Sequence, residues 1–166
     1  KRFKNIDYRQ ASRYKSMFSI KGKVSLKTNV TNNAIAKYES NKTNPNVRLL
    51  GIDDNFLELK GYKIAEGRNF STNEFTNAIN VCFLGVDVID QLFQKSSPLN
   101  HEIIVSGIKL KVIGVLAKKG NMMGGGDDRV IMVPLETGRK MAIGKNLTFD
   151  ITTSSTKVNN IDDFME

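Results

Sequence analysis

Histidine and cysteine each occur only once in this chain, and tryptophan does not occur at all. The single cysteine, Cys82, excludes an intrachain disulfide, and with His101 it makes too small a set for a zinc site. His101 is not part of an HExxH motif, and the chain has no GxSxG turn. The residues that a zinc hydrolase or a catalytic triad requires are therefore missing from the sequence. The sequence therefore predicts no catalytic residue, no metal site and no cofactor, which favours a protein that is not an enzyme.

Long hydrophobic runs are also missing. No stretch approaches the roughly 18 to 20 consecutive apolar residues that span a bilayer. The sequence starts without a methionine or a recognisable signal peptide. Residues 160–166 resemble the first turn of a helix, with Asn160 at the N-cap position and two aspartates just after it. We therefore expect the chain to be a piece of a longer protein.

Negative charge is scarce in the first quarter of the chain. Residues 1–42 contain eleven Lys or Arg and two acidic residues, whereas the rest sums to nearly zero out of a net charge of +8. Such a segment can contact nucleic acid, anionic lipid headgroups or an acidic protein, or it can be only a solvated face. No helix-turn-helix, zinc-finger or RNP pattern is present, so nucleic acid is the weakest of the functional options.

The sequence does contain a series of β-branched runs, centred on a hairpin. Residues 103–105 and 108–116 form the two runs, and Ser106 with Gly107 supplies a two-residue reversal. The second run alternates lysine with apolar residues and then becomes apolar on both faces, which predicts a strand that leaves a wet edge and enters the core. Gly114 within this run indicates a β-bulge or a close approach of another segment.

A glycine-rich loop follows the hairpin and contains Met122, Met123, Gly124, Gly125 and Gly126. The loop lacks the GK(S/T) of a phosphate-binding loop, and the two aspartates after it would repel phosphate. Its plain interpretation is a flexible connection. Because methionine is an adaptable apolar side chain, these five residues are also our candidate contact with a partner protein.

Two helix starts are marked by capping boxes, Asp7 with Gln10 and Ser71 with Glu74. The first helix should run to about residue 18. Its predicted apolar stripe consists of Ala11, Tyr14, Met17 and Phe18.

Two adjacent aspartates, Asp53 and Asp54, follow the strand expected at residues 47–52. A pair of carboxylates invites a metal or acid–base interpretation. Their position at the start of a helix is explained more simply by capping, so we predict that they cap this helix, which Gly61 should end.

The remaining pattern is strand, helix, strand at both ends with a β-rich middle. Strands are expected at residues 23–27, 34–38, 80–84, 130–133 and 147–153, a turn at 29–33, and helices at 87–93 and 135–143. This favours an α+β fold with two lobes. One lobe comprises residues 1–64 and 129–166, and a smaller β-rich lobe, residues 65–128, is inserted into it.

The order and spacing of these pieces resemble a known family. LLGIDDNFLELKGYKIAEGRNFS is followed by VCFLGVDVIDQLF, by VIGVL and, after the glycine loop, by a strand ending in VPLET. Over roughly residues 47–153 this resembles the extracytoplasmic core domain of MacB-like and FtsX-like ABC transporter permeases. The resemblance implies that the larger lobe is porter-like. It also implies that Gly67, Arg68, Phe70 and Ser71 mark the passage between the lobes.

The same resemblance implies a function. Such a domain is expected at the periplasmic face of the bacterial inner membrane, between two transmembrane helices of the permease. There it would couple ATP hydrolysis by a cytoplasmic ABC ATPase to substrate export or to mechanotransmission. The implied partners are that ATPase, a second permease in a dimer, and a periplasmic adaptor or carrier protein.

Two groups of residues become candidate sites under this interpretation. The basic residues Lys1, Arg2, Lys4, Arg9 and Arg13 would lie near the membrane, where anionic headgroups attract cations. The alternative function is a protein-binding module that docks a periplasmic adaptor, a lipoprotein carrier or a hydrolase through the methionine–glycine loop.

Overall fold

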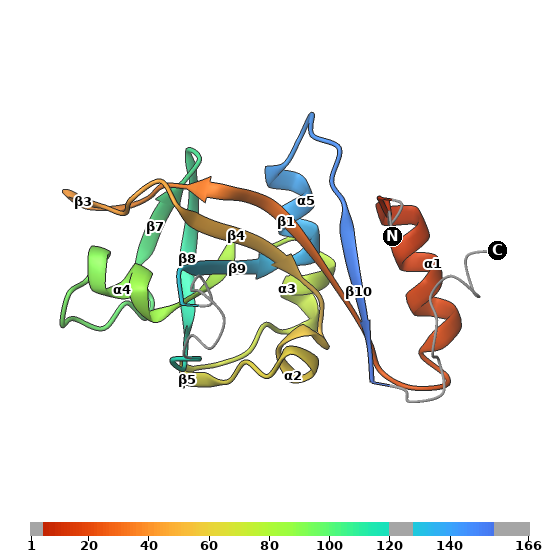
Figure 1. Cartoon of the computed structure of the whole chain (residues 1–166). Coiled ribbons are helices and arrows are strands. Elements are labelled where there is room, and N and C mark those ends of the chain that lie inside the picture. The colour runs from red at the N-terminus through yellow and green to blue at the C-terminus, as the bar shows by residue number, and fades with distance from the viewer. Residues whose placement is uncertain (1–4, 120–127, 155–166) are drawn as a thin grey trace.

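The computed structural model describes residues 5–119 and 128–154, and Figure 1 shows these as a curled mixed sheet with helices around it. The helices are α1 (Tyr8–Phe18), α2 (Phe56–Lys60), α3 (Thr72–Thr76), α4 (Val86–Leu92) and α5 (Leu135–Met141). The strands are β1 (Val24–Ala34), β2 (Ala36–Tyr38), β3 (Asn41–Lys42), β4 (Val47–Ile52), β5 (Ile64–Gly67), β6 (Val81–Leu84), β7 (Glu102–Val105), β8 (Ile108–Leu116), β9 (Val130–Pro134) and β10 (Phe149–Thr153). The predicted α+β class is confirmed.

The sheet brings together strands that are far apart in the sequence. Its hydrogen-bonded order is β10-β1-β4-β9-β6-β8-β7-β2-β3, and β5 pairs with β8 off this path. β4 and β9 are parallel, as are β6 and β8, whereas β9 and β6 are antiparallel. The pairing of β9 with β6 joins residues from either side of the predicted lobe boundary, and the division into two lobes stays a prediction.

The central strands β4, β6 and β9 are buried on both faces, because successive side chains of a strand point to opposite sides. Side chains on one face belong to one hydrophobic cluster and include Leu49, Cys82 and Ile131. Those on the other face belong to a second cluster and include Leu50, Phe83 and Met132. The helix α4 contributes to the first cluster and α2 to the second. This two-sided burial explains why these strands are continuous apolar runs in the sequence.

The predicted hairpin is confirmed as β7 and β8. Val105 is opposite Ile108, so Ser106 and Gly107 form the two-residue turn. Both have positive φ, 53° and 78°, as a type I′ turn requires. The twist of such a turn matches the twist of the two strands. The strands therefore stay in register from the turn to the pair Glu102 and Lys111.

Both features predicted for Gly114, a β-bulge and a close approach of another segment, are present. The pairing of β6 with β8 shifts register between Cys82 and Phe83, which is a β-bulge, and Phe83 lies opposite Gly114. A Cβ atom on Gly114 would be 2.7 Å from Cδ1 of Phe83, closer than real carbon atoms approach. Glycine is therefore needed here so that the Phe83 ring can pack against the backbone.

The turn predicted at residues 29–33 is wrong, because β1 continues to Ala34. β1 pairs with β4 over this stretch, with register shifts between Asn29 and Thr31 and between Thr31 and Ala34. Such bulges allow exposed polar residues to remain within a strand. Pairing with a remote strand thus overrides the local turn preference of asparagine. The strand predicted at residues 34–38 is confirmed only from Ala36 onward, as β2.

The connection from β5 to α3 is fixed by Arg68 and Glu74. Arg68 donates to both carboxylate oxygens of Glu74, at 2.8 and 2.9 Å. The backbone N–H of Ser71 also donates to this carboxylate at 2.7 Å, and the Ser71 hydroxyl accepts from the Glu74 backbone at 3.2 Å, so the predicted capping box is confirmed. The hydrogen bonds from Arg68 are the main cause that lowers the pKa of Glu74 from 4.5 to about 2.

This lowered pKa makes a pH-dependent contribution to stability. The ionised Glu74 stabilises the fold fully above the ordinary pKa of 4.5, and the contribution is lost as the pH falls towards about 2. We expect Glu74→Gln to lower the free energy of unfolding near neutral pH, and the difference from wild type to shrink as the pH falls from about 5 to about 2. Urea denaturation across this range measures it.

The matched control is Glu66→Gln, because Glu66 is exposed and makes no ion pair with another described residue. Its difference from wild type should stay small across the same range. A loss in Glu74→Gln that did not change with pH would contradict the role of the Arg68 pair.

Candidate functional site

The first and last described elements, α1 and β10, lie against each other at one end of the sheet (Figure 1). At the start of β10, the backbone N–H of Phe149 donates to the carbonyl of Ile6 at 2.8 Å. Beyond its end, Ser154 donates its backbone N–H to the carbonyl of Lys23 at 3.0 Å, and its hydroxyl accepts from the Lys23 backbone at 2.9 Å. We call this region, with α5 beside it, the α1–β10 corner.

The helix α1 is held in this corner by its buried side. Its predicted capping box is confirmed, since Asp7 accepts from the Gln10 backbone at 2.8 Å and the Gln10 side chain accepts from the Asp7 backbone. The buried side belongs to a third hydrophobic cluster, which contains Ala11, Tyr14, Val24, Leu26, Leu135 and Phe149. This cluster fastens α1 to β1, β10 and the start of α5.

The predicted apolar stripe of α1 is wrong at Met17, whose side chain is 53% exposed. Tyr14 and Phe18, in contrast, stack at a centroid distance of 4.5 Å on the side that faces the sheet. The described residues pack against only one side of α1. The stripe is therefore narrower than the sequence pattern suggested.

Polar contacts link α1 to α5. The Tyr8 hydroxyl donates to Glu136 at 2.8 Å, and Arg139 donates to the other carboxylate oxygen of Glu136 at 2.9 Å. The Arg139 guanidinium also lies 3.3 Å from the centroid of the Tyr8 ring, so the three side chains form a closed set. Since α5 packs on β1, β4 and β9, this set connects α1 to the central strands.

A second polar link joins α1 to the corner between β4 and α2. Lys15 donates to Asp53 at 2.8 Å and to Asp54 at 2.5 Å. Asp53 is only 7% exposed and also accepts the backbone N–H of Leu26 in β1 at 2.7 Å. One buried carboxylate therefore holds a helix, a strand and the start of another helix together.

The burial of this pair affects both pKa values. Burial raises the pKa of Asp53 above its ordinary value, while the hydrogen bonds from Lys15 and Leu26 oppose that rise. Burial acts to lower the pKa of Lys15, but hydrogen bonds to Asp53 and Asp54 outweigh it, and the pKa of Lys15 is raised. The positive charge of Lys15 is therefore firmly retained at neutral pH.

The predicted capping role of the two aspartates is wrong. The N-cap residue of α2 is Asn55, which makes no side-chain cap hydrogen bond. Asp53 instead turns back towards β1, where it also accepts from the Ser25 hydroxyl at 3.2 Å, and Asp54 reaches Lys15 from the surface. A buried carboxylate requires hydrogen-bond donors on all sides, and β1 and α1 provide them. The end of α2 is as predicted, with Gly61 in the left-handed conformation at φ 73°.

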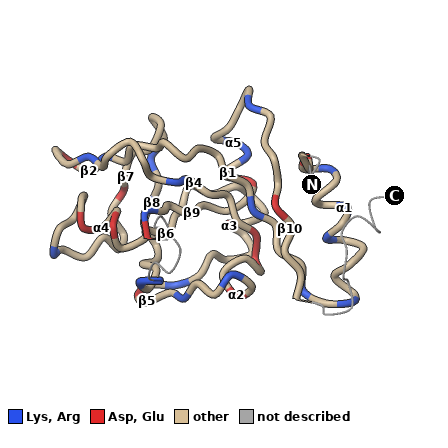
Figure 2. Tube along the Cα trace, in the orientation of Figure 1, with Lys and Arg blue, Asp and Glu red and all other residues tan. Residues whose placement is uncertain are grey.

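The positive charge concentrated in residues 1–42 is partly compensated in three dimensions. Lys15, Lys23 and Lys27 form ion pairs with the acidic residues Asp53, Asp54, Glu58 and Asp150, which follow later in the chain. Figure 2 shows the basic and acidic residues interspersed around this end of the sheet. Arg9 and Arg13 are exposed on α1 and make no ion pair with another described residue. The other predicted membrane-proximal residues, Lys1, Arg2 and Lys4, lie outside the described residues.

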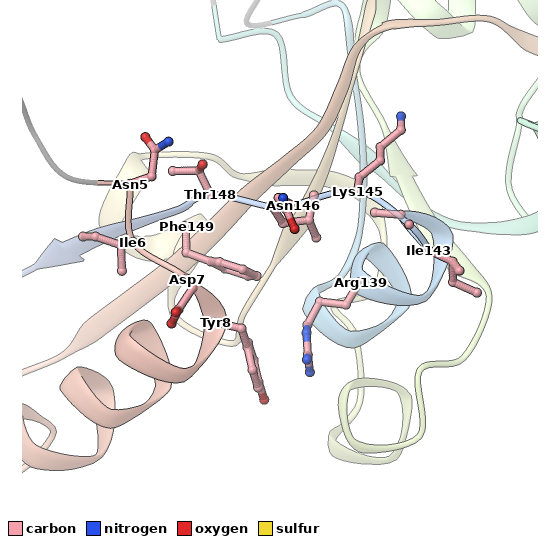
Figure 3. A pocket seen from close by; sticks show the side chains of 13 residues that line it. Asn5, Ile6, Asp7, Tyr8, Arg139, Ile143, Lys145, Asn146, Thr148 and Phe149 are labelled. Atoms are coloured by element: carbon pink, nitrogen blue, oxygen red, sulfur yellow. The ribbon is translucent and has the colours of Figure 1, made fainter.

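Two cavities flank α1. The larger, of about 510 Å³, is lined by residues from α1, α5 and the segment leading into β10, including Tyr8, Arg139 and Phe149 (Figure 3). The second, of about 430 Å³, lies near the Lys15–Asp53 link and is also lined by Phe70 and Phe75. The residues that form the links described above, Tyr8, Arg139, Lys15, Asp53 and Asp54, are among those that line them, so the arrangement is suited to holding α1 in place.

The described residues contain no group of three or more His, Cys, Asp or Glu placed to bind a metal ion. His101 is exposed and its Nδ1 lies 3.2 Å from the Tyr38 hydroxyl. Cys82 is completely buried between strands, and burial raises the pKa of its thiol. Neither residue lies at the α1–β10 corner.

The methionine–glycine loop, Met122 to Gly126, lies outside the described residues. On its two flanks, the backbone N–H of Lys119 donates to the Asp128 side chain at 2.9 Å. The Asp128 carbonyl in turn accepts from Asp87 at the start of α4 at 3.1 Å. The contact predicted for the loop stays a prediction.

Sequence reasoning missed the residues that tie α1 in place, namely Tyr8, Glu136, Arg139 and the Lys15–Asp53 pair. Tyr8 and Glu136 are 128 positions apart, and Lys15 and Asp53 are 38 apart. No spacing rule connects such positions. One indication of these contacts was present in the sequence: Asp53 directly follows a strand expected to be buried, and a buried charge needs a partner.

The unequal burial of the two aspartates gives a testable difference. Asp53→Ala leaves the Leu26 N–H and the Ser25 hydroxyl without their acceptor, so we expect the free energy of unfolding to fall by about 2–4 kcal/mol. Asp54→Ala removes an exposed partner of the same lysine, and the loss should stay below about 1 kcal/mol. Urea denaturation at neutral pH compares them. Equal losses would contradict the role assigned to Asp53.

The chain can now be compared with known proteins. The family model of the MacB-like periplasmic core domain matches residues 4–165. The macrolide export ATP-binding/permease protein MacB of Syntrophobacter fumaroxidans is 36% identical over 100 residues, which cover 60% of this chain and 14% of that protein. The ABC transporter permease YknZ of Bacillus subtilis is 29% identical over 104 residues, covering 63% and 26%. The chain spans only 14–26% of the length of these relatives.

Solved structures show the same fold. The extracellular domain of the transporter YknZ from Gram-positive bacteria has a TM-score of 0.74 at 22% identity, covering 93% of this chain and 76% of that one. The periplasmic region of MacB from Actinobacillus actinomycetemcomitans has a TM-score of 0.74 at 16% identity, covering 98% and 71%. Among the described residues, no helix has the length and apolar character needed to span a bilayer. The family match over nearly the whole chain and the shared fold lead to one conclusion: the chain belongs to the MacB-like periplasmic core domain family, the extracytoplasmic domain of ABC transporter permeases.

Proposed function

We propose that this domain transmits movement between the membrane segments of a permease and the extracytoplasmic space. It would couple ATP hydrolysis by a cytoplasmic ABC ATPase to substrate export or to mechanotransmission. The observation that carries the proposal is the α1–β10 corner, where the first and last described elements are hydrogen-bonded to the same body. A displacement of either element is thereby passed to the sheet.

The links from α1 lead to the strands at the centre of the sheet, which are buried on both faces. The Tyr8–Glu136–Arg139 set reaches α5, and the Lys15–Asp53 pair reaches both β1 and the end of β4. The central strands are packed on both faces, and close-packed interiors transmit displacement with little compression. Movement of α1 would therefore shift the whole sheet, including the far hairpin β7–β8.

The proposed partners follow from this function. They are the cytoplasmic ABC ATPase, reached through the membrane part of the permease, a second permease in a dimer, and a periplasmic adaptor or carrier protein. The domain itself would carry out no chemistry and hold no cofactor. The alternative, a protein-binding module, depends on the methionine–glycine loop, and the described residues add no support to it.

The proposal predicts which segments the gene encodes before and after this domain. We expect one hydrophobic segment of about 20 residues before Lys1 and three after Glu166, because a bilayer-spanning helix needs that length. Reading the full open reading frame checks this directly. A stop codon at once after Glu166, or a globular domain joined directly to either end of the chain without a hydrophobic segment between them, would overturn the proposal.

The mechanical role predicts a second outcome in the full-length dimeric permease. Spin labels at Arg9 on α1 and at Lys109 on the β8 hairpin should both change their inter-protomer distances between the ATP-bound and ADP-bound states. In Tyr8→Phe/Lys15→Met, which removes both polar links of α1, the Arg9 label should still move while the Lys109 label moves much less. Double electron–electron resonance measures these distances. Within this domain the native Cys82 is buried and will not compete for the label, and exposed cysteines elsewhere in the permease are replaced by serine.

The matched control is Lys23→Met, because Lys23 forms only an exposed ion pair with Glu58. It should leave both label responses as in wild type. A Lys109 label that is insensitive to nucleotide in the wild type, or fully responsive in the double variant, would contradict the proposed transmission path.

A further inference from the structure

The outward side of α1 carries two arginines followed by exposed apolar side chains. Arg9, Arg13 and Met17 are spaced four residues apart, so they form one row along the helix. The two arginines face away from the buried Ala11, and Met17 lies at the edge of the outward side, next to Tyr14. Just past the helix end, Ile20 is 90% exposed, the highest value among the large hydrophobic residues described, and Met17 is 53% exposed. We call these four exposed residues, together with Lys21, the α1 outer stripe.

The charge of the α1 outer stripe has one sign. Within Tyr8–Phe18 there is no acidic residue, and the nearest one, Asp7, is occupied in the capping box. Lys15 on the same helix is neutralised by Asp53 and Asp54, but Arg9, Arg13 and Lys21 have no carboxylate partner among the described residues. Lys21 does lie over the Phe18 ring, 5.9 Å from its centroid. The stripe therefore offers cations without a carboxylate partner beside exposed apolar side chains.

This combination is typical of a helix that lies in the interface of an anionic membrane. Such a helix places cations at the headgroups and apolar side chains at the acyl boundary. The stripe is also close to the end of the described chain, since Ser154 is hydrogen-bonded to Lys23, two residues after Lys21. In the proposed function, one membrane segment precedes Lys1 and another follows Glu166, so both chain ends of the α1–β10 corner lead towards the bilayer.

We propose that the α1 outer stripe binds an anionic bilayer surface, with Arg9, Arg13 and Lys21 at phosphate headgroups and Met17 and Ile20 inserted at the acyl boundary. This inference rests on the proposed function and adds the lipid class to it. Contact with the bilayer would keep α1 at the membrane surface, where movement of the membrane segments would reach the sheet through α1.

Vesicle flotation of the 166-residue chain tests this inference. We expect binding to vesicles of phosphatidylglycerol mixed with phosphatidylcholine, increasing with the anionic fraction and falling with added salt, and little binding to phosphatidylcholine alone. Arg9→Ser and Arg13→Ser should each lower the partition coefficient roughly fivefold, as expected for about 1 kcal/mol per cation. Met17→Ser/Ile20→Ser should lower it several-fold with the charge unchanged.

Matched controls keep the outcome interpretable. Ile104→Ser changes an isoleucine that is 40% exposed on β7, far from α1 in the order of the sheet. Lys60→Ser/Lys63→Ser removes two exposed lysines near α2 and β5. Both controls should bind like the wild type. Circular dichroism of every variant ensures that lost binding reflects the surface.

Several results would overturn the inference. These are the absence of binding, binding that ignores the anionic fraction, and equal losses in the control variants. A loss in the arginine variants with full binding in Met17→Ser/Ile20→Ser would also overturn it, since the chain would then be held at the headgroups by charge alone, without insertion at the acyl boundary. If the gene shows the flanking hydrophobic segments while flotation fails, only this inference is lost and the proposed function stands.

Discussion

A buried carboxylate needs donors from several directions, and Asp53 obtains them from elements that are separate in sequence. Its oxygens accept from Lys15 in α1, from Leu26 in β1 and from the Ser25 hydroxyl. Each donor is satisfied only if α1, β1 and the end of β4 adopt one relative position. The placement of α1 on the sheet, and with it the α1–β10 corner, depends on this requirement together with the hydrophobic contacts of Ala11 and Tyr14.

The α1–β10 corner lies against a sheet whose central strands are closely packed. Strands β4, β6 and β9 are buried on both faces, and Gly114 allows Phe83 to pack directly against β8. In the proposed function, the body would move as a unit when α1 is displaced.

The charge distribution illustrates how tertiary structure changes the meaning of a sequence feature. In the sequence, residues 1–42 form one basic block. In the structure, Lys15, Lys23 and Lys27 are paired with acidic residues from later segments, whereas Arg9 and Arg13 remain exposed. The block thus divides into cations that support the fold and cations that are available to another surface.

The sequence by itself determined the features that depend on neighbouring residues. The Asp7–Gln10 and Ser71–Glu74 capping boxes, the Ser106–Gly107 turn and the apolar central strands all follow from local hydrogen bonding and side-chain alternation. The order of these pieces was enough to indicate the family. The tertiary structure alone decided the sheet order, the continuation of β1 through Asn32 and Asn33, and the partners of Asp53 and Tyr8. Those contacts join positions tens of residues apart, and their energies depend on burial and distance, which no local pattern in the chain encodes.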